Sequence, residues 1–172
     1  MLGSVATGVA VDERRLAMAD GAWVTVVRFR AGQVRYLLHV GSQDPPVNDV
    51  SLGPGAQPAI GPDEDKLLLG AFNGGFRTST GAGGFEVGGR VPVPLRAGLA
   101  SFVIDADGSA RVGLWGQDLP APGEQVASVR QNLAPPVAGG RAGAQADEVA
   151  PWGATLGGVE RCPQRLGRGP PR

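Results

Sequence analysis

A chain of 172 residues is long enough for one domain with a buried core, and its 42% of apolar residues excludes a disordered protein. The formal net charge of zero gives no electrostatic case for binding nucleic acid or an anionic membrane. No apolar run approaches the roughly 18 residues of a membrane span, and residues 1–12 lack the basic start and apolar centre of a signal peptide. Cys162 is the only cysteine, so no internal disulfide bond is possible and the redox compartment is left open.

The first half of the chain is predicted to contain three strands. After a lead-in over residues 1–20, the β-branched and aromatic residues of 23–29 and 34–40 predict two strands joined by a short turn. Residues 42–62 are rich in Gly, Pro, Asp and Asn, which predicts a long loop. The short apolar run 66–72 predicts a third, buried strand, because turn residues follow it directly.

The turn after this third strand, Asn73-Gly74-Gly75-Phe76, is the most informative motif of the sequence. Asn and Gly tolerate positive φ, so the chain can bend sharply there. The two glycines leave backbone N–H groups uncovered, and Asn73 adds an amide with two donors and an acceptor. A rigid strand that delivers such donors to a sheet edge suits the binding of an oxyanion or a sugar hydroxyl. The alternative interpretation is a strand followed by an ordinary glycine turn.

The second half is predicted to be rich in short strands and turns. Glycine-rich residues 77–90 predict a loop, and 99–105 and 109–115 predict two strands joined by an Asp-Ala-Asp-Gly hairpin turn. Residues 125–133 suit either a short strand or a helical turn, and 135–151 are loop-like. These elements predict an α+β fold, mostly β, built on a twisted mixed sheet.

Several individual residues are candidates for a site. His39 favours a structural hydrogen bond over an acid–base role, and a single His without a Cys or carboxylate cluster predicts no zinc site. Asp105 and Asp107 flank a turn, so turn chemistry is their first interpretation. The acidic run 63–65 is predicted to be a solvated loop, with a cation site as the alternative. Trp152 is the best tryptophan for stacking on a sugar, because glycine-rich sequence surrounds it.

Five segments recur in a characteristic order: AFNGGF at 71–76, VIDADG at 103–108, LWG at 114–116, RQNL at 130–133 and WGATLG at 152–157. Together they resemble the phosphodiester glycosidase family, which includes the enzyme that uncovers mannose 6-phosphate on lysosomal proteins and bacterial exopolysaccharide-related proteins. The resemblance covers residues 21–158, which we therefore expect to form a partial phosphodiester glycosidase-like domain.

The resemblance implies hydrolysis of a sugar-1-phosphodiester in a polysaccharide or glycoconjugate, at an extracellular or cell-envelope location. Such chemistry needs donors for the phosphate oxygens and an acid or base beside the anomeric carbon. The implied substrate-binding residues are Asn73, Gly74, Gly75, Gln131, Asn132 and Trp152. No catalytic residue, cofactor or metal is assigned, and the sugar and its partner group stay open. The alternative function is a non-catalytic cell-surface module that binds polysaccharide.

The composition changes at residues 159–172, which are rich in Arg and Pro and have neither strand alternation nor a helical face. The family's Arg-Ser/Thr-x-x-Gly segment and Asp-Gly-Gly-Gly-Ser turn are missing, yet dropping one nucleotide at the Val159 codon can restore the first of them. We therefore expect a frameshifted tail on a truncated domain, and an unstable and inactive product. The alternative is a basic, Pro-rich tail that binds a partner.

Overall fold

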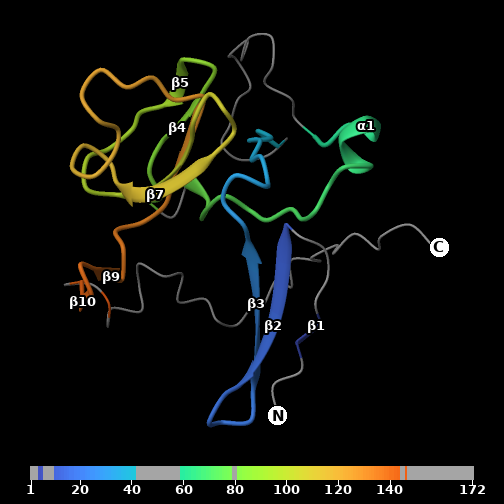
Figure 1. Cartoon of the computed structure of the whole chain (residues 1–172). Helices are drawn as coiled ribbons and strands as arrows, with labels where there is room; N and C mark the ends of the chain where they lie inside the picture. Colours follow the sequence, from blue (N-terminus) through green and yellow to red (C-terminus); the bar gives the residue numbers. More distant parts are fainter. Residues whose placement is uncertain (1–3, 6–9, 42–58, 79–80, 144–145, 147–172) are drawn as a thin grey trace.

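The computed structural model describes residues 4–5, 10–41, 59–78, 81–143 and 146, and these form a β-rich protein (Figure 1). Its largest sheet has the strand order β5-β4-β8-β6-β7, and a long ribbon has the order β1-β2-β3. Their bounds are β1 Ser4–Val5, β2 Val11–Ala17, β3 Trp23–Phe29, β4 Phe85–Val87, β5 Arg90–Val93, β6 Ala100–Ile104, β7 Ala110–Leu114 and β8 Ser128–Gln131. A small hairpin, β9 Val137–Ala138 with β10 Arg141–Ala142, and the short helix α1 Pro62–Asp65 complete the described elements.

The β-rich class is confirmed, but every pairing between named strands in the described part of the chain is antiparallel rather than mixed. Tight turns that reverse the chain direction account for the pairs β2–β3, β4–β5, β6–β7 and β9–β10, whereas β8 pairs antiparallel with β4 and β6 across longer connections. Gly88 and Gly89, with φ of +56° and +74°, turn β4 into β5. Between β6 and β7 the Asp105 N–H donates to Ser109 O at 2.9 Å, and Gly108 has a φ of +83°.

The five-stranded sheet has two faces of different character. Register pairs place Ser101, Val103, Val129 and Gln131 on one face, where all four are fully buried. We call this the closed face. A layer of apolar side chains packs on its Val103 and Val129, and its members are Leu95, Trp115, Leu119 and Val126.

The opposite side, which we call the pocket face, carries Phe85, Arg130, Phe102 and Val112 in cross-strand register. At its β4 end, Phe85 packs with Val87 and Val40 in a second buried cluster. At its β7 end the cover is incomplete, because Val112 is 73% exposed. The pocket face is therefore closed at one end and open at the other.

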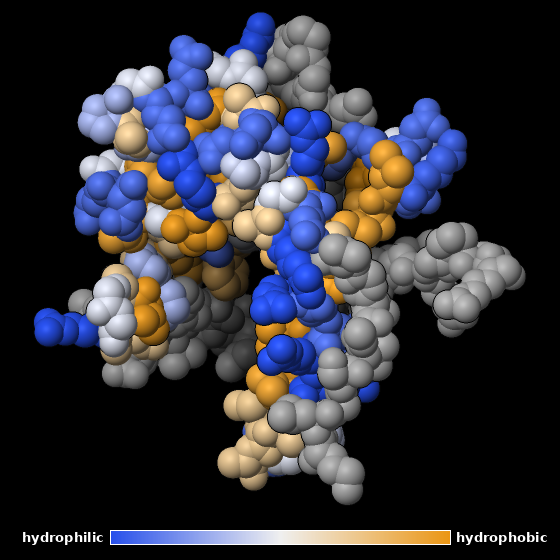
Figure 2. All heavy atoms as spheres, in the orientation of Figure 1, coloured by the Kyte–Doolittle hydropathy of each residue, from blue (hydrophilic) through white to orange (hydrophobic). Residues whose placement is uncertain are grey.

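The ribbon of β2 and β3 extends away from the five-stranded sheet (Figure 1). Seven residue pairs hold the two strands together, from Val11 with Phe29 to Ala17 with Trp23. Figure 2 shows apolar surface along this ribbon, interleaved with charged groups. The exposed large apolar side chains there are Leu16, Met18, Trp23, Val24 and Val26. Residues 1–20, predicted as a lead-in, thus contain a strand that pairs along the whole of β3.

Three predicted strands are confirmed, with shifts of at most one residue at their ends. They are 23–29 as β3, 99–105 as β6 and 109–115 as β7. Residues 125–133, left open between strand and helical turn, contain the central strand β8. The predicted strand at 34–40 is wrong. Its segment crosses the β6–β7 hairpin, where the Tyr36 N–H donates to Gly108 O at 2.8 Å and Arg35 Nε donates to Asp107 O at 3.0 Å.

The predicted buried strand at 66–72 is also wrong, because the segment has no strand pairing and is largely exposed. The exposed fractions are 82% at Leu67, 50% at Leu69 and 56% at Phe72. The acidic run before it forms α1 rather than a loop, with Pro62 at the first helical position and the Glu64 carboxylate accepting from the Gly61 N–H. An apolar run therefore lies on the surface here, next to the open end of the pocket face.

The loop predicted at 77–90 contains β4, with Phe85 only 1% exposed. The glycines before it allow a close approach rather than a loop, since a Cβ on Gly84 would lie 2.1 Å from Pro94 O. The loop predicted at 135–151 contains the β9–β10 hairpin. Trp152 and the predicted tail at 159–172 lie outside the described residues. Within the described part of the chain, no helix has the length and apolar character needed to cross a membrane.

Candidate functional site

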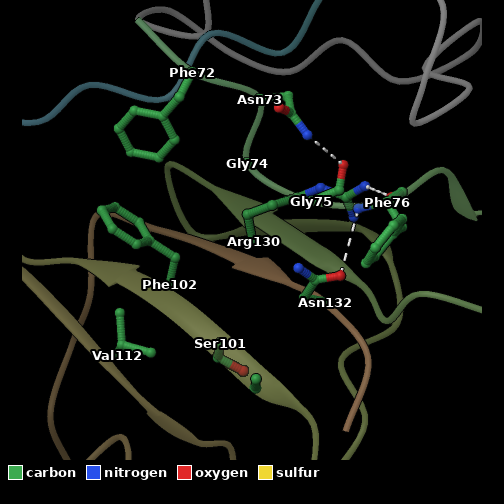
Figure 3. Close-up of a pocket in the computed structure, with 11 residues that line it drawn as sticks. Phe72, Asn73, Gly74, Gly75, Phe76, Ser101, Phe102, Val112, Arg130 and Asn132 are labelled. Carbon is green, nitrogen blue, oxygen red and sulfur yellow. Dashed lines mark hydrogen bonds between the residues drawn. The ribbon is translucent and has the colours of Figure 1, made fainter. Parts of the chain in front are cut away.

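An open pocket with a volume of about 340 Å³ lies between the segment 72–76 and the pocket face of the five-stranded sheet (Figure 3). Its lining residues are Phe72, Asn73, Gly74, Gly75, Phe76, Ala100, Ser101, Phe102, Val112, Arg130 and Asn132. The volume lies in the range of small-ligand sites. Strands β6, β7 and β8 thus supply the floor, and the Asn-Gly-Gly segment supplies the rim.

Strand β8 and the residue after it hold the Asn-Gly-Gly segment in place. Arg130 Nη2 donates to Phe76 O at 2.8 Å, and Asn132 Oδ1 accepts from the Phe76 N–H at 3.4 Å (Figure 3). Within the segment, Asn73 Nδ2 donates to Gly75 O at 3.2 Å. Alternation along a strand places residues 130 and 132 on the same side. The segment therefore has a defined position although no strand pairs with it.

The two glycines of the motif act through lack of bulk rather than through positive φ. Neither has a positive φ, and no non-glycine residue among those described has one. A Cβ on Gly74 would lie 3.0 Å from Arg130 Cγ, and one on Gly75 would lie 3.2 Å from Gln131 O. The predicted bend is present at Gly75 and Phe76, but it is made without positive φ, and the small size of the glycines lets the segment lie directly on β8.

The rim carries hydrogen-bond donors without partners among the described residues. The backbone N–H groups of Asn73, Gly74 and Gly75 donate no hydrogen bond there. The Oδ1 atom of Asn132 accepts from two backbone N–H groups, Phe76 and Leu133, which leaves its Nδ2 donors unused within the described part of the chain. With the guanidinium of Arg130 in the same wall, this arrangement suits an anion or a group rich in oxygen acceptors.

The described lining has no group that readily moves a proton at neutral pH. It contains no Asp, Glu, His, Cys, Lys or Tyr. Arg130 stays protonated throughout the physiological range. The described pocket can therefore bind and orient a ligand, whereas a general acid or base has to come from outside these eleven residues.

Four of the six predicted substrate-binding residues line this pocket: Asn73, Gly74, Gly75 and Asn132. Gln131 does not, because its side chain lies on the closed face and is fully buried. Its Oε1 accepts from the N–H groups of Gly84 and Arg96, at 3.0 and 2.7 Å. Its Nε2 donates to Arg96 O at 2.9 Å and to Ser101 Oγ at 3.1 Å. Gln131 therefore joins β4, β6 and β8, and the sixth residue, Trp152, lies outside the described residues.

Sequence reasoning missed Arg130, Phe102 and Val112 as pocket residues. A strand assignment for 128–131 would have identified Arg130, because strand alternation places Arg130 and Asn132 on one face of the sheet and Gln131 on the other. Phe102 and Val112 follow from register, since they lie directly opposite each other on β6 and β7. The sequence alone does not define that register, because it depends on how β6 and β7 pair in the folded hairpin.

The other candidate residues have structural surroundings. His39 Nε2 lies 3.5 Å from Glu64 Oε2, while its buried Nδ1 has no partner among the described residues. Asp107 accepts from the Ser109 backbone N–H at 2.8 Å, and this hydrogen bond holds the pKa of Asp107 below its usual range. Asp105 forms an ion pair with Arg111, whose pKa is raised by its hydrogen bonds to Asp105 and Glu124.

Metal binding finds no support in the described residues, which contain no group of three or more His, Cys, Asp or Glu side chains suited to an ion. Comparison of the chain with protein-family models, with curated proteins and with solved structures found no match. The geometry of the pocket and the motif resemblance are therefore the two supports for a function.

Proposed function

We propose that the chain is a phosphodiester glycosidase-like protein, an α+β domain of the extracellular space or cell envelope. Its pocket binds the sugar-1-phosphodiester group of a polysaccharide or glycoconjugate. The observation that carries the proposal is the cluster of unused donors at Asn73, Gly74, Gly75 and Asn132 beside the Arg130 guanidinium. The motif resemblance supports the same ligand, because its first motif contains the Asn-Gly-Gly segment that forms the rim of the pocket.

A phosphodiester suits this wall for electrostatic reasons. Its two non-bridging oxygens share one negative charge and accept several hydrogen bonds, and the rim has backbone N–H donors next to the positive charge of Arg130. No carboxylate of the described lining opposes that charge. A donor set of this kind also stabilises charge that develops during hydrolysis, if an acid or base is supplied next to it.

The alternative, a non-catalytic module that binds a phosphate-containing polysaccharide, is favoured by one observation. The described lining has no residue able to act as general acid or base near neutral pH. We therefore expect the chain to bind the ligand with no measurable turnover. Release of the chromophore from a chromogenic sugar phosphodiester would favour the enzyme over the binding module.

The test of the site uses Asn132→Asp, because the carboxylate keeps the acceptor that holds the Phe76 N–H but replaces the Nδ2 donors with negative charge. Binding of a sugar-1-phosphodiester, measured by calorimetric titration, should weaken by about tenfold or more. The matched control is Gln125→Glu, which adds the same charge at an exposed position outside the pocket and should leave the affinity unchanged. Equal affinities of Asn132→Asp and the unmodified chain would refute the proposed site.

A further inference from the structure

The pocket has two chemically different ends. Figure 3 shows Phe72, Phe102 and Val112 together on one side, and Asn73, Gly75 and Asn132 on the other. The second side holds the donors on which the proposed function rests. The first side is apolar and has no hydrogen-bonding side chain, so it needs a different ligand chemistry.

The apolar end is open to solvent. Val112 is 73% exposed and Phe72 is 56% exposed, although both lie against the half-buried Phe102. Exposed apolar surface gathered inside a pocket gains free energy when an apolar group covers it. Scattered exposed apolar residues carry no such meaning, but these three line one continuous depression.

Edge-to-face contacts between aromatic rings hold the apolar end of the pocket in place. The rings of Phe72 and Phe102 meet at a centroid distance of 5.8 Å and an angle of 78°. The ring centroids of Phe102 and Tyr36 lie 5.5 Å apart, and those of Tyr36 and Phe29 of the ribbon lie 6.2 Å apart. Each contact is of the T-shaped type that aromatic pairs prefer. Because these rings are already positioned, a ligand loses little free energy in ordering them.

We propose that this apolar end receives an aryl or alkyl substituent of the phosphodiester, so that the preferred ligands are amphiphilic phosphodiesters. This inference rests on the proposed function for the anionic end of the ligand. The phosphate lies against the donors of residues 73–75 and 132, and its apolar substituent lies on Phe72, Phe102 and Val112. A second copy of the chain fits less well, because a stable interface needs about 800 Å² from each partner. One aromatic side chain supplies about 150–250 Å² even when it is fully covered.

The test compares two monoanionic diesters that differ in one substituent, dimethyl phosphate and methyl phenyl phosphate. Both are titrated into the full chain by NMR, and the phenyl compound should bind about tenfold more tightly. In Val112→Ser this advantage should fall to about threefold or less. Val137→Ser is the matched control, because Val137 is 60% exposed and lies on β9, outside the pocket. That control should keep the full advantage.

The outcomes separate the two proposals. Equal affinity for both diesters, or an unchanged phenyl advantage in Val112→Ser, overturns the apolar end and leaves the proposed function standing. If the phenyl compound keeps its advantage but Asn132→Asp changes the affinity for neither diester, the apolar end is supported and the phosphodiester site is overturned. Binding of neither diester overturns both. The inference is also overturned if sedimentation shows a dimer that Val112→Ser dissociates, since a second copy of the chain would then cover the apolar end.

Discussion

Val129 and Val112 belong to the same five-stranded sheet, yet the first is fully buried and the second is 73% exposed. Val129 lies on the central strand β8, on the closed face, under a layer of apolar side chains that includes Leu119. Val112 lies on the edge strand β7, at the open end of the pocket face. One face of this sheet therefore holds the fold together, while part of the other is available to a ligand.

The largest effect is expected at Gln131, the polar centre of the closed face. Gln131→Leu removes an amide that makes four hydrogen bonds, so the buried N–H of Gly84, the part-buried N–H and carbonyl of Arg96 and the buried hydroxyl of Ser101 lose this partner. Each buried group left unpaired costs about 1–3 kcal/mol, so the free energy of unfolding should fall by about 4 kcal/mol or more. Urea denaturation measures the change.

The control for this prediction is Gln125→Leu, the same replacement at an exposed position on the approach to β8. Its free energy of unfolding should stay within about 0.5 kcal/mol of the unmodified chain. Should Gln131→Leu prove as stable as this control, the closed face would not depend on its polar network, and Gln131 would return to the set of possible binding residues.

The next effect comes from the two valines themselves, which allow the same truncation on both faces. Val129→Ala removes two buried methyl groups and should lower the free energy of unfolding by about 2 kcal/mol. Val112→Ala should change it by less than about 0.5 kcal/mol, because its side chain is mostly in water already. Thermal and urea unfolding of the pair give the difference. Similar losses for both would mean that the open end of the pocket face is covered in solution.

The sequence predicted the parts of this sheet that local signals specify. The hairpin of β6 and β7 follows from two β-rich runs around an Asp-Gly turn, and Gly108 has the positive φ that such a turn requires. The apolar run 66–72 was misjudged because hydrophobicity alone does not say what will cover a segment. Leu67 and Leu69 lie on the surface, and no strand among the described residues pairs with them.

The candidate site was likewise predicted only where the signal is local in the sequence. Asn73, Gly74 and Gly75 carry a local signal, and the structure places all three on the pocket rim. Gln131 and Asn132 are adjacent in sequence, but strand alternation sends them to opposite faces. The role of the glycines depends on their distance from Arg130 and from Gln131 O, which only the tertiary structure defines.

The smallest effect tests the closed face by its response to pH. Glu86 lies half-buried on β4, directly opposite Val129, and burial raises the pKa of its carboxyl group above 4.5. Because the folded state prefers the protonated form, the contribution of Glu86 to stability is complete below pH 4.5 and is lost as the pH rises through the raised pKa. Glu86→Gln should therefore match the unmodified chain at low pH and exceed its stability at neutral pH, by less than about 1 kcal/mol.

Asp12 on the ribbon supplies a control of opposite sign. Hydrogen bonds from Arg28 and then Arg30 hold the pKa of Asp12 below 3.8, so its contribution is present above that pH and is lost as the pH falls. Asp12→Asn should be less stable than the unmodified chain at neutral pH and equal to it in strong acid. The two difference curves, from urea unfolding between about pH 2 and pH 8, should thus have opposite signs. A Glu86→Gln curve that is flat or negative would mean that water reaches the closed face at β4, and the contrast between the two faces would then be confined to the central strand.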